Sequence, residues 1–342
     1  MKNPSILFTK INHAELVDDE LPEVRGDLVK IKTAFTTLSP GTERANIIGS
    51  DSVSGVKAPA VHFPRSAGYS ASGVVVEVGE DVTDIAVGDR VIGFWTKHKA
   101  YNVIPAERVV KIPDELSLPL AAQIFVATFP MAAIRKCRLE AGEPALVMGL
   151  GLLGQYAVRL LRAAGAVPIV AVDPVASRRD EALAGGADYA LDPTDEGFAD
   201  RVKALTGGGA AVAIEVTGVG AGLDGALDCM KKQGRIALLG CTRDKHFYID
   251  YYRKVHCPGI TLIGAHTNAR PEHESYPGYF THRDDITAIV KLLTHKRMAF
   301  DGLSSEIHSP DDCTLIYDRL IREKAFPTVV LFDWSRLGQG AK

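Results

Sequence analysis

Cysteines are few in this chain, and they follow no pattern typical of disulfides or metal sites. The 342 residues include only Cys137, Cys229, Cys241, Cys257 and Cys313. The count is odd and the sequence has no Cys-x-x-Cys pair, which argues against a disulfide framework and against a zinc ribbon. We therefore expect free, buried thiols in a reducing compartment.

Long basic runs and long apolar runs are also missing. The chain has 39 Lys and Arg and 42 Asp and Glu, a net charge of −3, and its basic residues are scattered. This distribution argues against nucleic acid or an anionic membrane as a partner. The most apolar region, Ala145 to Val172, is broken by Arg159 and Arg162, so we expect no membrane span. The N-terminal apolar run is too short for a secretory signal, and we expect a cytoplasmic protein.

The first third of the chain has the pattern of a β domain. Hydrophobic residues make up 46% of the sequence, enough for a core, and the length is typical of two domains. Short apolar or alternating segments separated by Gly turns indicate strands of a closed or partly closed barrel. These predicted strands are Asp27–Thr37, Ser72–Val78, Val87–Phe94, Tyr101–Ile104 and Arg108–Ile112.

The middle of the chain changes to an α/β pattern. Between Leu116 and Arg138, apolar residues recur at the three- and four-residue spacing of a helix. Strands then alternate with helices, which predicts a parallel, doubly wound sheet covered on both faces. The predicted strands are Ala145–Met148, Pro168–Val172, Tyr189–Leu191, Val212–Val216, Arg235–Leu239 and Ile260–Ile263. The predicted helices begin near Leu152, Ser177, Gly197 and Gly222.

After Gly264 the alternation stops, and a tail follows that we expect to complete the first domain. The tail is predicted to contain a loop from Ala265 to His282, helices over Asp284–His295 and Asp311–Arg322, and a strand over Thr328–Phe332. We therefore predict a discontinuous domain of residues 1–119 and 267–342, with a second domain of residues 120–266 between its two parts.

The strongest chemical signal is a glycine-rich turn between a predicted strand and a predicted helix. The strand ALVM precedes the turn, and an amphipathic helix follows it. Gly149 permits a sharp turn, Gly151 leaves room for a pyrophosphate, and Gly154 lets the helix pack closely on the strand. The first N–H groups of the helix also favour phosphate. The predicted pyrophosphate site comprises Gly149, Gly151, Leu152, Leu153 and Gly154.

An acidic residue ends the next predicted strand. Asp173 is positioned to accept hydrogen bonds from both hydroxyls of an adenosine ribose, and it would repel a 2′-phosphate. This favours NAD(H) over NADP(H). Arg178 is expected near the same ribose, or else exposed in the first turn of a helix. Because Arg179 stands beside it, NADP(H) stays an alternative.

These stretches together resemble the medium-chain dehydrogenase/reductase superfamily, which includes the zinc-type alcohol dehydrogenases. Residues 66–91 (SAGYSASGVVVEVGEDVTDIAVGDRV) are similar to its barrel signature, and the 149–154 turn with Asp173 is similar to its cofactor domain. EVTGVG at 215–220 and GRIALLG at 234–240 match later strands of that domain. The resemblance implies a GroES-like catalytic barrel, an inserted Rossmann domain, and a homodimer or homotetramer formed through the Rossmann sheet.

The resemblance also implies further cofactor contacts. Thr217 and Gly218 would border the adenosine half of the cofactor. The residues implied beside the nicotinamide are Leu239, Gly240, Ala265 and His266. Each could equally be an ordinary residue at a strand end.

The positions that hold zinc in such relatives carry other residues here. Zinc-bearing members use a Cys in a CGxD-like turn, a His in a GHE triplet, and a third Cys or Glu. This chain has Pro40, Tyr69 and Phe125 at those positions, with Gln123 as the nearest polar alternative to Phe125. Zinc needs three converging nitrogen, sulfur or carboxylate ligands. We therefore expect no zinc.

Without a metal, a side chain must handle the substrate proton. Tyr69 is the first candidate because its phenol stands where the metal cluster would be, although it could be an ordinary barrel tyrosine. Thr42 and Glu43 are the next candidates, unless they only cap a helix. The remaining candidates are His98, with Lys97 beside it, and His266. A lone histidine is more often simply a satisfied surface or core residue.

The segment 268–283 (NARPEHESYPGYFTHR) is rich in aromatic and charged residues. Such a loop would suit a sugar or cyclitol substrate, or it would be an interdomain or dimer contact. We predict a zinc-independent, NAD-dependent dehydrogenase that interconverts a secondary alcohol and a ketone on a polar small molecule. The alternatives are a zinc-less NAD(P)H enone or quinone reductase and a non-catalytic nucleotide-binding sensor.

Overall fold

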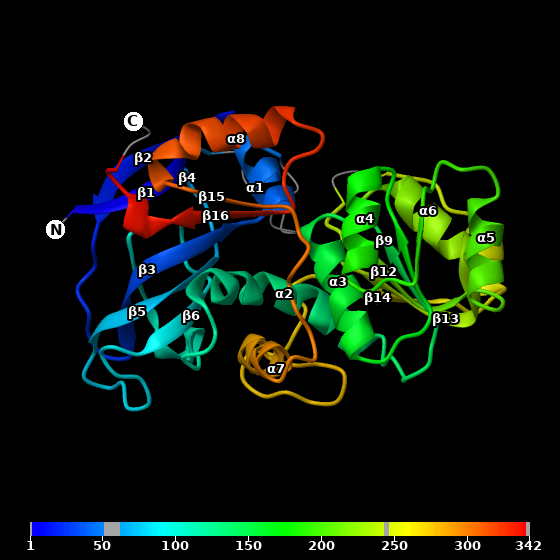
Figure 1. Cartoon of the computed structure of the whole chain (residues 1–342), viewed down its shortest axis with the longest axis horizontal. Coiled ribbons are helices and arrows are strands. Elements are labelled where there is room, and N and C mark those ends of the chain that lie inside the picture. Colours follow the sequence, from blue (N-terminus) through cyan, green and yellow to red (C-terminus); the bar gives the residue numbers. More distant parts are fainter. Residues whose placement is uncertain (1, 51–61, 243–245, 340–342) are drawn as a thin grey trace. The chain divides into compact units, whose positions relative to one another are not determined.

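The computed structural model describes residues 2–50, 62–242 and 246–339, and the chain divides into two compact units (Figure 1). The barrel unit is Met1–Val126 with Ser304–Lys342, and the Rossmann unit is Ala127–Leu303. The predicted discontinuity of the first domain is present, but its second part begins at 304 instead of 267. Residues 267–303 belong to the Rossmann unit because they pack on it, as described below.

The barrel unit is built mainly of antiparallel sheet. Its seven-stranded sheet has the order β15-β16-β3-β5-β6-β8, with β7 also paired to β3, and its three-stranded sheet has the order β2-β1-β4. Among the strands that the structure describes in this unit, only the β15–β16 pair is parallel. The elements are β1 (Lys2–Lys10), β2 (His13–Glu20), β3 (Leu28–Leu38), α1 (Pro40–Ile47), β4 (Arg65–Ser66), β5 (Ser70–Val78), β6 (Arg90–Phe94), β7 (Tyr101–Pro105), η1 (Ala106–Arg108), β8 (Val109–Lys111), β15 (Ser305–His308), η3 (Pro310–Asp312), α8 (Cys313–Arg322), β16 (Val329–Asp333) and η4 (Trp334–Arg336).

The core of the barrel follows from the two-residue period of its strands. Val29 and Ile31 of β3 point to the same face and are fully buried together with Val75 of β5 and Val91 of β6. A second cluster joins the N-terminal strands, which the sequence patterns missed, to α8 and β16. Only the last part of the predicted tail, from Ser304 onward, therefore belongs to this unit.

The Rossmann unit contains a six-stranded parallel sheet of order β11-β10-β9-β12-β13-β14. Counted along the chain from β9, this is the 3-2-1-4-5-6 order of dinucleotide-binding folds, and the order reverses between β9 and β12. The elements are β9 (Ala145–Met148), α3 (Leu152–Ala163), β10 (Ile169–Val172), α4 (Ala176–Ala184), β11 (Tyr189–Leu191), α5 (Phe198–Leu205), β12 (Ala210–Glu215), α6 (Gly220–Asp228), β13 (Met230–Leu238), η2 (Tyr252–His256), β14 (Thr261–Gly264) and α7 (His282–Thr294).

Helices cover both faces of this sheet, which explains why its central strands are almost entirely apolar. Leu146 and Met148 of β9 join a buried cluster with Phe198 of α5 and Leu223 of α6. Val147, which points the other way, faces Gly154 of α3. The four helices α3–α6 can be followed around the strands in Figure 1.

Helix α2 (Leu118–Lys136) runs from one unit into the other and is unusually apolar. Within the described part of the chain it is the one helix long and apolar enough to cross a membrane, whereas the sequence analysis had singled out residues 145–172. Of its most apolar window, 72% is buried inside the protein, as in the core helix of a globular fold.

Candidate functional site

A cavity of about 550 Å³ opens at the carboxyl ends of β9, β10 and β12. This is the place where the strand order reverses, which is where open α/β sheets bind ligands. Its lining includes five residues that the sequence analysis singled out: Gly149, Gly151, Asp173, Arg178 and Thr217. These five residues come from three separate segments of the chain, which the fold brings into one concave site.

The glycine turn has the geometry expected of a pyrophosphate site. Gly149 has a φ of +96°, a conformation that favours glycine, and its N–H donates to the Val172 carbonyl at 2.8 Å. A Cβ on Gly151 would meet nothing within 4 Å, so its face is open to a ligand. A Cβ on Gly154 would lie 1.9 Å from the Gly149 carbonyl oxygen. Close packing of α3 on the turn thus requires glycine at 154.

Asp173 is held at the edge of the cavity by the backbone around it. One carboxylate oxygen accepts the Leu150 N–H at 2.9 Å, and the other accepts the Val175 N–H at 2.8 Å. The side chain is buried, with Arg178 Nη1 3.6 Å away. Because each carboxylate oxygen has a second lone pair, Asp173 retains the capacity to accept hydrogen bonds from a ligand.

The two arginines near the predicted ribose site differ in their roles. Arg179 donates to the backbone carbonyl of Asp173 at 2.7 Å and to the Asp192 carboxylate at 3.0 Å. Arg178 is the one that lines the cavity. Any contact with a 2′-phosphate would therefore fall to Arg178.

A buried acid that the sequence analysis missed organises the next strand end. Glu215 Oε1 accepts the N–H groups of Thr217 at 2.8 Å and of Gly218 at 3.2 Å, and also the Thr217 hydroxyl. Burial raises the pKa of the Glu215 carboxyl. Its backbone carbonyl also accepts the N–H groups of Leu239 and Gly240, at 2.9 and 2.8 Å. The signal in the sequence was an acid at the end of an otherwise apolar strand.

The turn after β14 is fixed by a lysine from α2. Lys136 Nζ donates to the Gly264 carbonyl at 3.0 Å and also to the Ala269 carbonyl at 2.5 Å. Between these anchors, Ala265 is buried and donates its N–H to Leu238, and His266 Nδ1 accepts the N–H of Asn268. These residues lie beyond the cavity lining, at the adjoining strand end.

Several charged and aromatic side chains of the loop before α7 are engaged in contacts within the Rossmann unit. The guanidinium of Arg270 pairs with Asp285 at 3.1 Å and donates to the Thr128 carbonyl at 3.1 Å. Arg135 lies 2.8 Å from the same carboxylate and stacks over the Phe280 ring at 3.7 Å. Arg270 and Asp285 are almost fully buried. These contacts explain why residues 267–303 pack with the Rossmann unit.

In the barrel unit, Tyr69 is a half-buried polar candidate close to the start of α1. It follows Gly68, and its hydroxyl donates to Ser39 Oγ. The rings of Trp95 and Phe125 lie on its flanks, each with a centroid distance of 6.0 Å. The phenol therefore has an aromatic surround and a hydroxyl partner.

Glu43 and His98, far apart in the sequence, meet inside the barrel. His98 Nε2 lies 3.2 Å from a Glu43 carboxylate oxygen, and His98 Nδ1 lies 2.7 Å from Thr36 Oγ1. Glu43 also accepts the Ser39 N–H at 2.9 Å and the Tyr317 hydroxyl. His98 is 0% exposed and Glu43 is 2% exposed, so both side chains lie in the interior of the barrel unit.

Thr42 and Glu43 lie within the first turn of α1, not at its cap. The helix begins at Pro40 with Ser39 as its N-cap. The Thr42 carbonyl accepts a hydrogen bond from Asn46 at 2.9 Å. Lys97 is exposed.

The residues at the expected metal positions do not fit zinc. Pro40 has no ligating atom, Phe125 is buried among aromatic rings, and Gln123 donates its amide to the Pro119 carbonyl at 3.1 Å. Within residues 2–50, 62–242 and 246–339, no group of three or more His, Cys, Asp or Glu side chains converges as a metal site would require.

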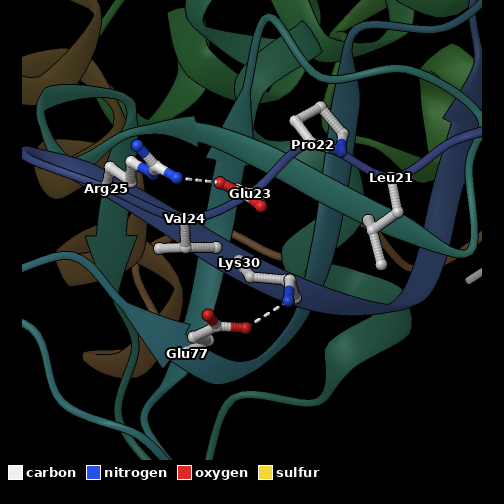
Figure 2. A pocket seen from close by; sticks show the side chains of 7 residues that line it. All are labelled: Leu21, Pro22, Glu23, Val24, Arg25, Lys30 and Glu77. Carbon is white, nitrogen blue, oxygen red and sulfur yellow. Dashed lines mark hydrogen bonds and ion pairs between the residues drawn. The ribbon is translucent and has the colours of Figure 1, made fainter.

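A second cavity, of about 380 Å³, lies on the surface of the barrel unit (Figure 2). Its charged side chains are paired with one another, Lys30 with Glu77 and Arg25 with Glu23. Each of these charged groups already has a partner of opposite sign. The Rossmann cavity is therefore the better candidate for a ligand.

The structure combines a GroES-like barrel with a Rossmann fold that carries the glycine-turn cavity, and comparison with known families agrees with this architecture. The family model "Alcohol dehydrogenase GroES-like domain" matches residues 28–114, and "Zinc-binding dehydrogenase" matches residues 153–281. The chain belongs to the zinc-type alcohol dehydrogenase-like branch of the medium-chain dehydrogenase/reductase superfamily.

Similar proteins include several named dehydrogenases. D-guloside 3-dehydrogenase of Escherichia coli (strain K12) is 31% identical over 229 residues, which are 66% of this chain and 65% of that protein. (R,R)-butanediol dehydrogenase of Bacillus subtilis (strain 168) is 34% identical over 293 residues, 77% of this chain and 79% of that protein. The crystal structure of the Bacillus subtilis butanediol dehydrogenase matches 97% of this chain and 99% of its own, with a TM-score of 0.81 and 25% identity.

An alcohol dehydrogenase from Escherichia coli CFT073, solved in complex with NADH, has the same fold. It matches 97% of this chain and 99% of its own, with a TM-score of 0.81 and 17% identity.

Proposed function

We propose that this protein is an oxidoreductase that uses NAD(H) to interconvert a secondary alcohol and a ketone on a polar, polyol-like small molecule, without zinc. The observation that carries the proposal is Asp173, an acid held by two backbone N–H groups at the rim of the glycine-turn cavity. The named activities of the relatives, on a guloside and on a butanediol, support the substrate class.

The cavity residues suit the parts of a dinucleotide. Gly149 and Gly151 leave the backbone bare for the pyrophosphate, at the N-terminus of α3. Asp173 would accept hydrogen bonds from the adenosine ribose. The bound nicotinamide would supply the hydride acceptor or donor for the substrate carbon. The turns at Leu239–Gly240 and Ala265–His266 are proposed to border it.

Zinc independence is proposed from the chemistry of the replaced positions. Pro40 and Phe125 offer no ligand, so proton handling is assigned to the chain's own polar side chains, first of all to Tyr69. Thr42 shares the first turn of α1, whereas Glu43 and His98 support that turn from the interior.

Two measurements test the proposed function. Purified protein should contain well under one equivalent of zinc by elemental analysis and should keep its activity after dialysis against a chelator. A panel of sugars, polyols and enones should give turnover with a polyol and NAD⁺. Stoichiometric zinc would refute the metal-free mechanism, and turnover confined to enones with NADPH would favour an enone reductase. Silence across the panel would favour a nucleotide-binding sensor.

The enone-reductase alternative is supported by one specific observation. Arg178 lines the cavity 3.6 Å from Asp173, where a 2′-phosphate of NADP(H) would need a cation. Arg178→Ala separates the two cases. It should leave NADH affinity within about twofold if Asp173 holds the ribose, and it should weaken NADPH binding strongly if Arg178 selects NADP(H).

We also propose a homodimer or homotetramer joined through the Rossmann sheet. In support, β14 is the terminal strand of that sheet, and its Leu262 side chain is exposed. An exposed apolar edge strand is a site for pairing with a second copy. Leu262→Lys should lower the mass measured by light scattering; an unchanged mass would argue against this interface.

A further inference from the structure

We infer that Ser39 is a second proton-handling residue, and that its hydroxyl works as a pair with the phenol of Tyr69. The inference rests on the proposed function, since it names the group that assists Tyr69 in proton transfer in a reaction without zinc. It adds a residue that neither the sequence patterns nor the family resemblance indicated.

The first support is the contact itself. The Tyr69 hydroxyl donates to Ser39 Oγ, and the two residues come from different segments, β3–α1 and the turn before β5. Ser39 is only 6% exposed, whereas Tyr69 is partly exposed. Tyr69 is therefore the more accessible residue of the pair, and Ser39 is the buried one.

The second support is what the Ser39 hydroxyl does not do. A serine at an N-cap commonly accepts an N–H from the first helical turn with its side chain. Ser39 is the N-cap of α1, but its side chain makes no such capping bond. Instead, Glu43 accepts the Ser39 N–H at 2.9 Å, and the Ser39 carbonyl accepts the Glu43 N–H at 2.9 Å. The Ser39 hydroxyl is therefore not used in capping, and it accepts the hydrogen bond from Tyr69 instead.

The third support is the environment of the pair. Because α1 begins with Pro40, the first N–H groups at its N-terminus belong to Gly41 and Thr42, and a helix N-terminus favours negative charge. Among the residues that the structure describes, none would come within 4 Å of a Cβ on Gly41. A phenolate formed on Tyr69 would therefore develop next to a favourable dipole.

A hydroxyl partner suits this chemistry because it both accepts and donates hydrogen bonds. In ketone reduction, the carbonyl carbon gains a hydride from the dihydronicotinamide, and the carbonyl π pair moves to oxygen. That oxygen forms a bond to the Tyr69 proton as the phenol O–H bond breaks, which leaves alcohol, oxidised nicotinamide and Tyr69 phenolate. Ser39 then rotates its O–H to donate to the phenolate until water restores the proton.

Glu43 and His98 act as positioning residues for the pair. Glu43 receives hydrogen bonds from Ser39 N–H and the Tyr317 hydroxyl, and its carboxylate contacts His98. These contacts fix the start of α1, and with it the direction of the Ser39 side chain. Glu43→Gln should therefore change the same readouts as Ser39→Ala, but less.

The test follows the ionisation of Tyr69 in the folded full-length chain, with no substrate present. The chain has 10 tyrosines, so the ultraviolet difference between wild type and Tyr69→Phe isolates this phenol. Ser39→Ala should move its ionisation midpoint up by about one pH unit, a tenfold loss of acidity. Ser39→Thr, which keeps a hydroxyl, should restore it. Ser72→Ala is the matched control, because Ser72 is a buried barrel serine whose hydroxyl bonds the Leu118 carbonyl instead.

The second readout is kinetic. With an accepted alcohol, Ser39→Ala should lower kcat about 10- to 100-fold and shift its pH profile to higher pH, with NADH affinity unchanged. An unmoved Tyr69 midpoint, or an equal shift in Ser72→Ala, would overturn the pair whatever the turnover. A wild-type protein silent on every substrate would overturn the proposed function, while the titration still decides whether the pair exists.

Discussion

At the scale of single residues, we propose that the choice between NAD(H) and NADP(H) depends mainly on one carboxylate. Asp173 is oriented by the backbone N–H groups of Leu150 and Val175, so its position does not depend on the ligand. The Arg178 guanidinium lies 3.6 Å from this carboxylate and lines the same cavity. On this proposal, Asp173 as the ribose acceptor and Arg178 as the phosphate cation together set the cofactor preference.

Asp173→Asn should weaken NADH binding by about 10-fold and NADPH binding less, because the amide neither repels a 2′-phosphate nor accepts as strongly. Nicotinamide fluorescence titrations with both cofactors give the ratio of dissociation constants. Asp188→Asn is the control, since Asp188 caps the backbone of Ile169 outside the cavity. An unchanged ratio would remove Asp173 from cofactor selection.

The cysteines allow a second residue-scale prediction. Cys137, Cys229 and Cys313 are buried, as expected, but Cys241 and Cys257 are exposed, which the sequence analysis did not anticipate. Burial raises the pKa of Cys137 and of Cys229 to about 12 and that of Cys313 to about 11. Thiolate is the reactive form. A thiol reagent should thus titrate two equivalents rapidly in the native protein and five after denaturation.

At the scale of elements, two glycines of the turn between β9 and α3 are expected to serve different purposes, one in packing and the other in cofactor binding. A methyl group on Gly154 would lie 1.9 Å from the Gly149 carbonyl, whereas one on Gly151 would meet nothing within 4 Å. Gly154→Ala should lower the free energy of unfolding by about 1–3 kcal/mol, because α3 must shift. Gly151→Ala should leave stability nearly unchanged but weaken NADH binding, because its methyl group occupies the pyrophosphate side.

Denaturant unfolding and NADH titration of both variants check this contrast. The two variants serve as each other's controls, since they add the same group three residues apart. Equal losses of stability in both variants would show that neither position accepts a methyl group. That result would contradict separate roles for Gly151 in binding and Gly154 in packing.

The contact between β15 and α8 should be sensitive to acid. Arg319 donates to both Glu306 oxygens, at 2.7 and 3.1 Å, and these hydrogen bonds lower the pKa of Glu306 to about 2. Because the folded pKa lies below the unfolded value, this stabilisation is present above about pH 4.5 and is lost as the pH falls toward 2. The pair is partly exposed, so its contribution is about 1 kcal/mol.

Glu306→Gln should therefore be less stable to unfolding than wild type at pH 7. The difference in stability between the two proteins should be smaller at pH 3. Urea midpoints of both proteins at the two pH values measure it. Glu323→Gln, which removes the other partner of Arg319, should show a smaller gap. A stability difference that increases in acid would contradict a lowered pKa of Glu306 in the folded protein.

At the scale of the whole molecule, cofactor binding should stabilise the unit that holds the cavity. All of the lining residues belong to the Rossmann unit. NADH at about 100 times its dissociation constant should add about 2.7 kcal/mol to the unfolding free energy. Calorimetry with and without NADH measures the shift. If two transitions appear, only one should move, and Asp173→Asn should reduce that movement.

Much of this architecture was accessible from local patterns. Strands β9 and β11 have the predicted bounds, and α3 begins at the predicted Leu152. These elements are buried on both faces or strictly amphipathic, so their periodicity is clear. The β1–β2 hairpin was missed because its outer strand is half exposed and polar. The Glu43–His98 contact joins residues 55 positions apart in the chain, which no local pattern encodes.

By itself, the sequence determined the family and the glycine turn with its acid, because each is a matter of residue type and short spacing. Only the tertiary structure decided which polar groups meet. It brought Ser39 to Tyr69 and Glu43 to His98, and it turned Arg270 inward to Asp285. Partners of this kind are selected by burial, since a buried polar atom must find whichever donor or acceptor the packing places beside it.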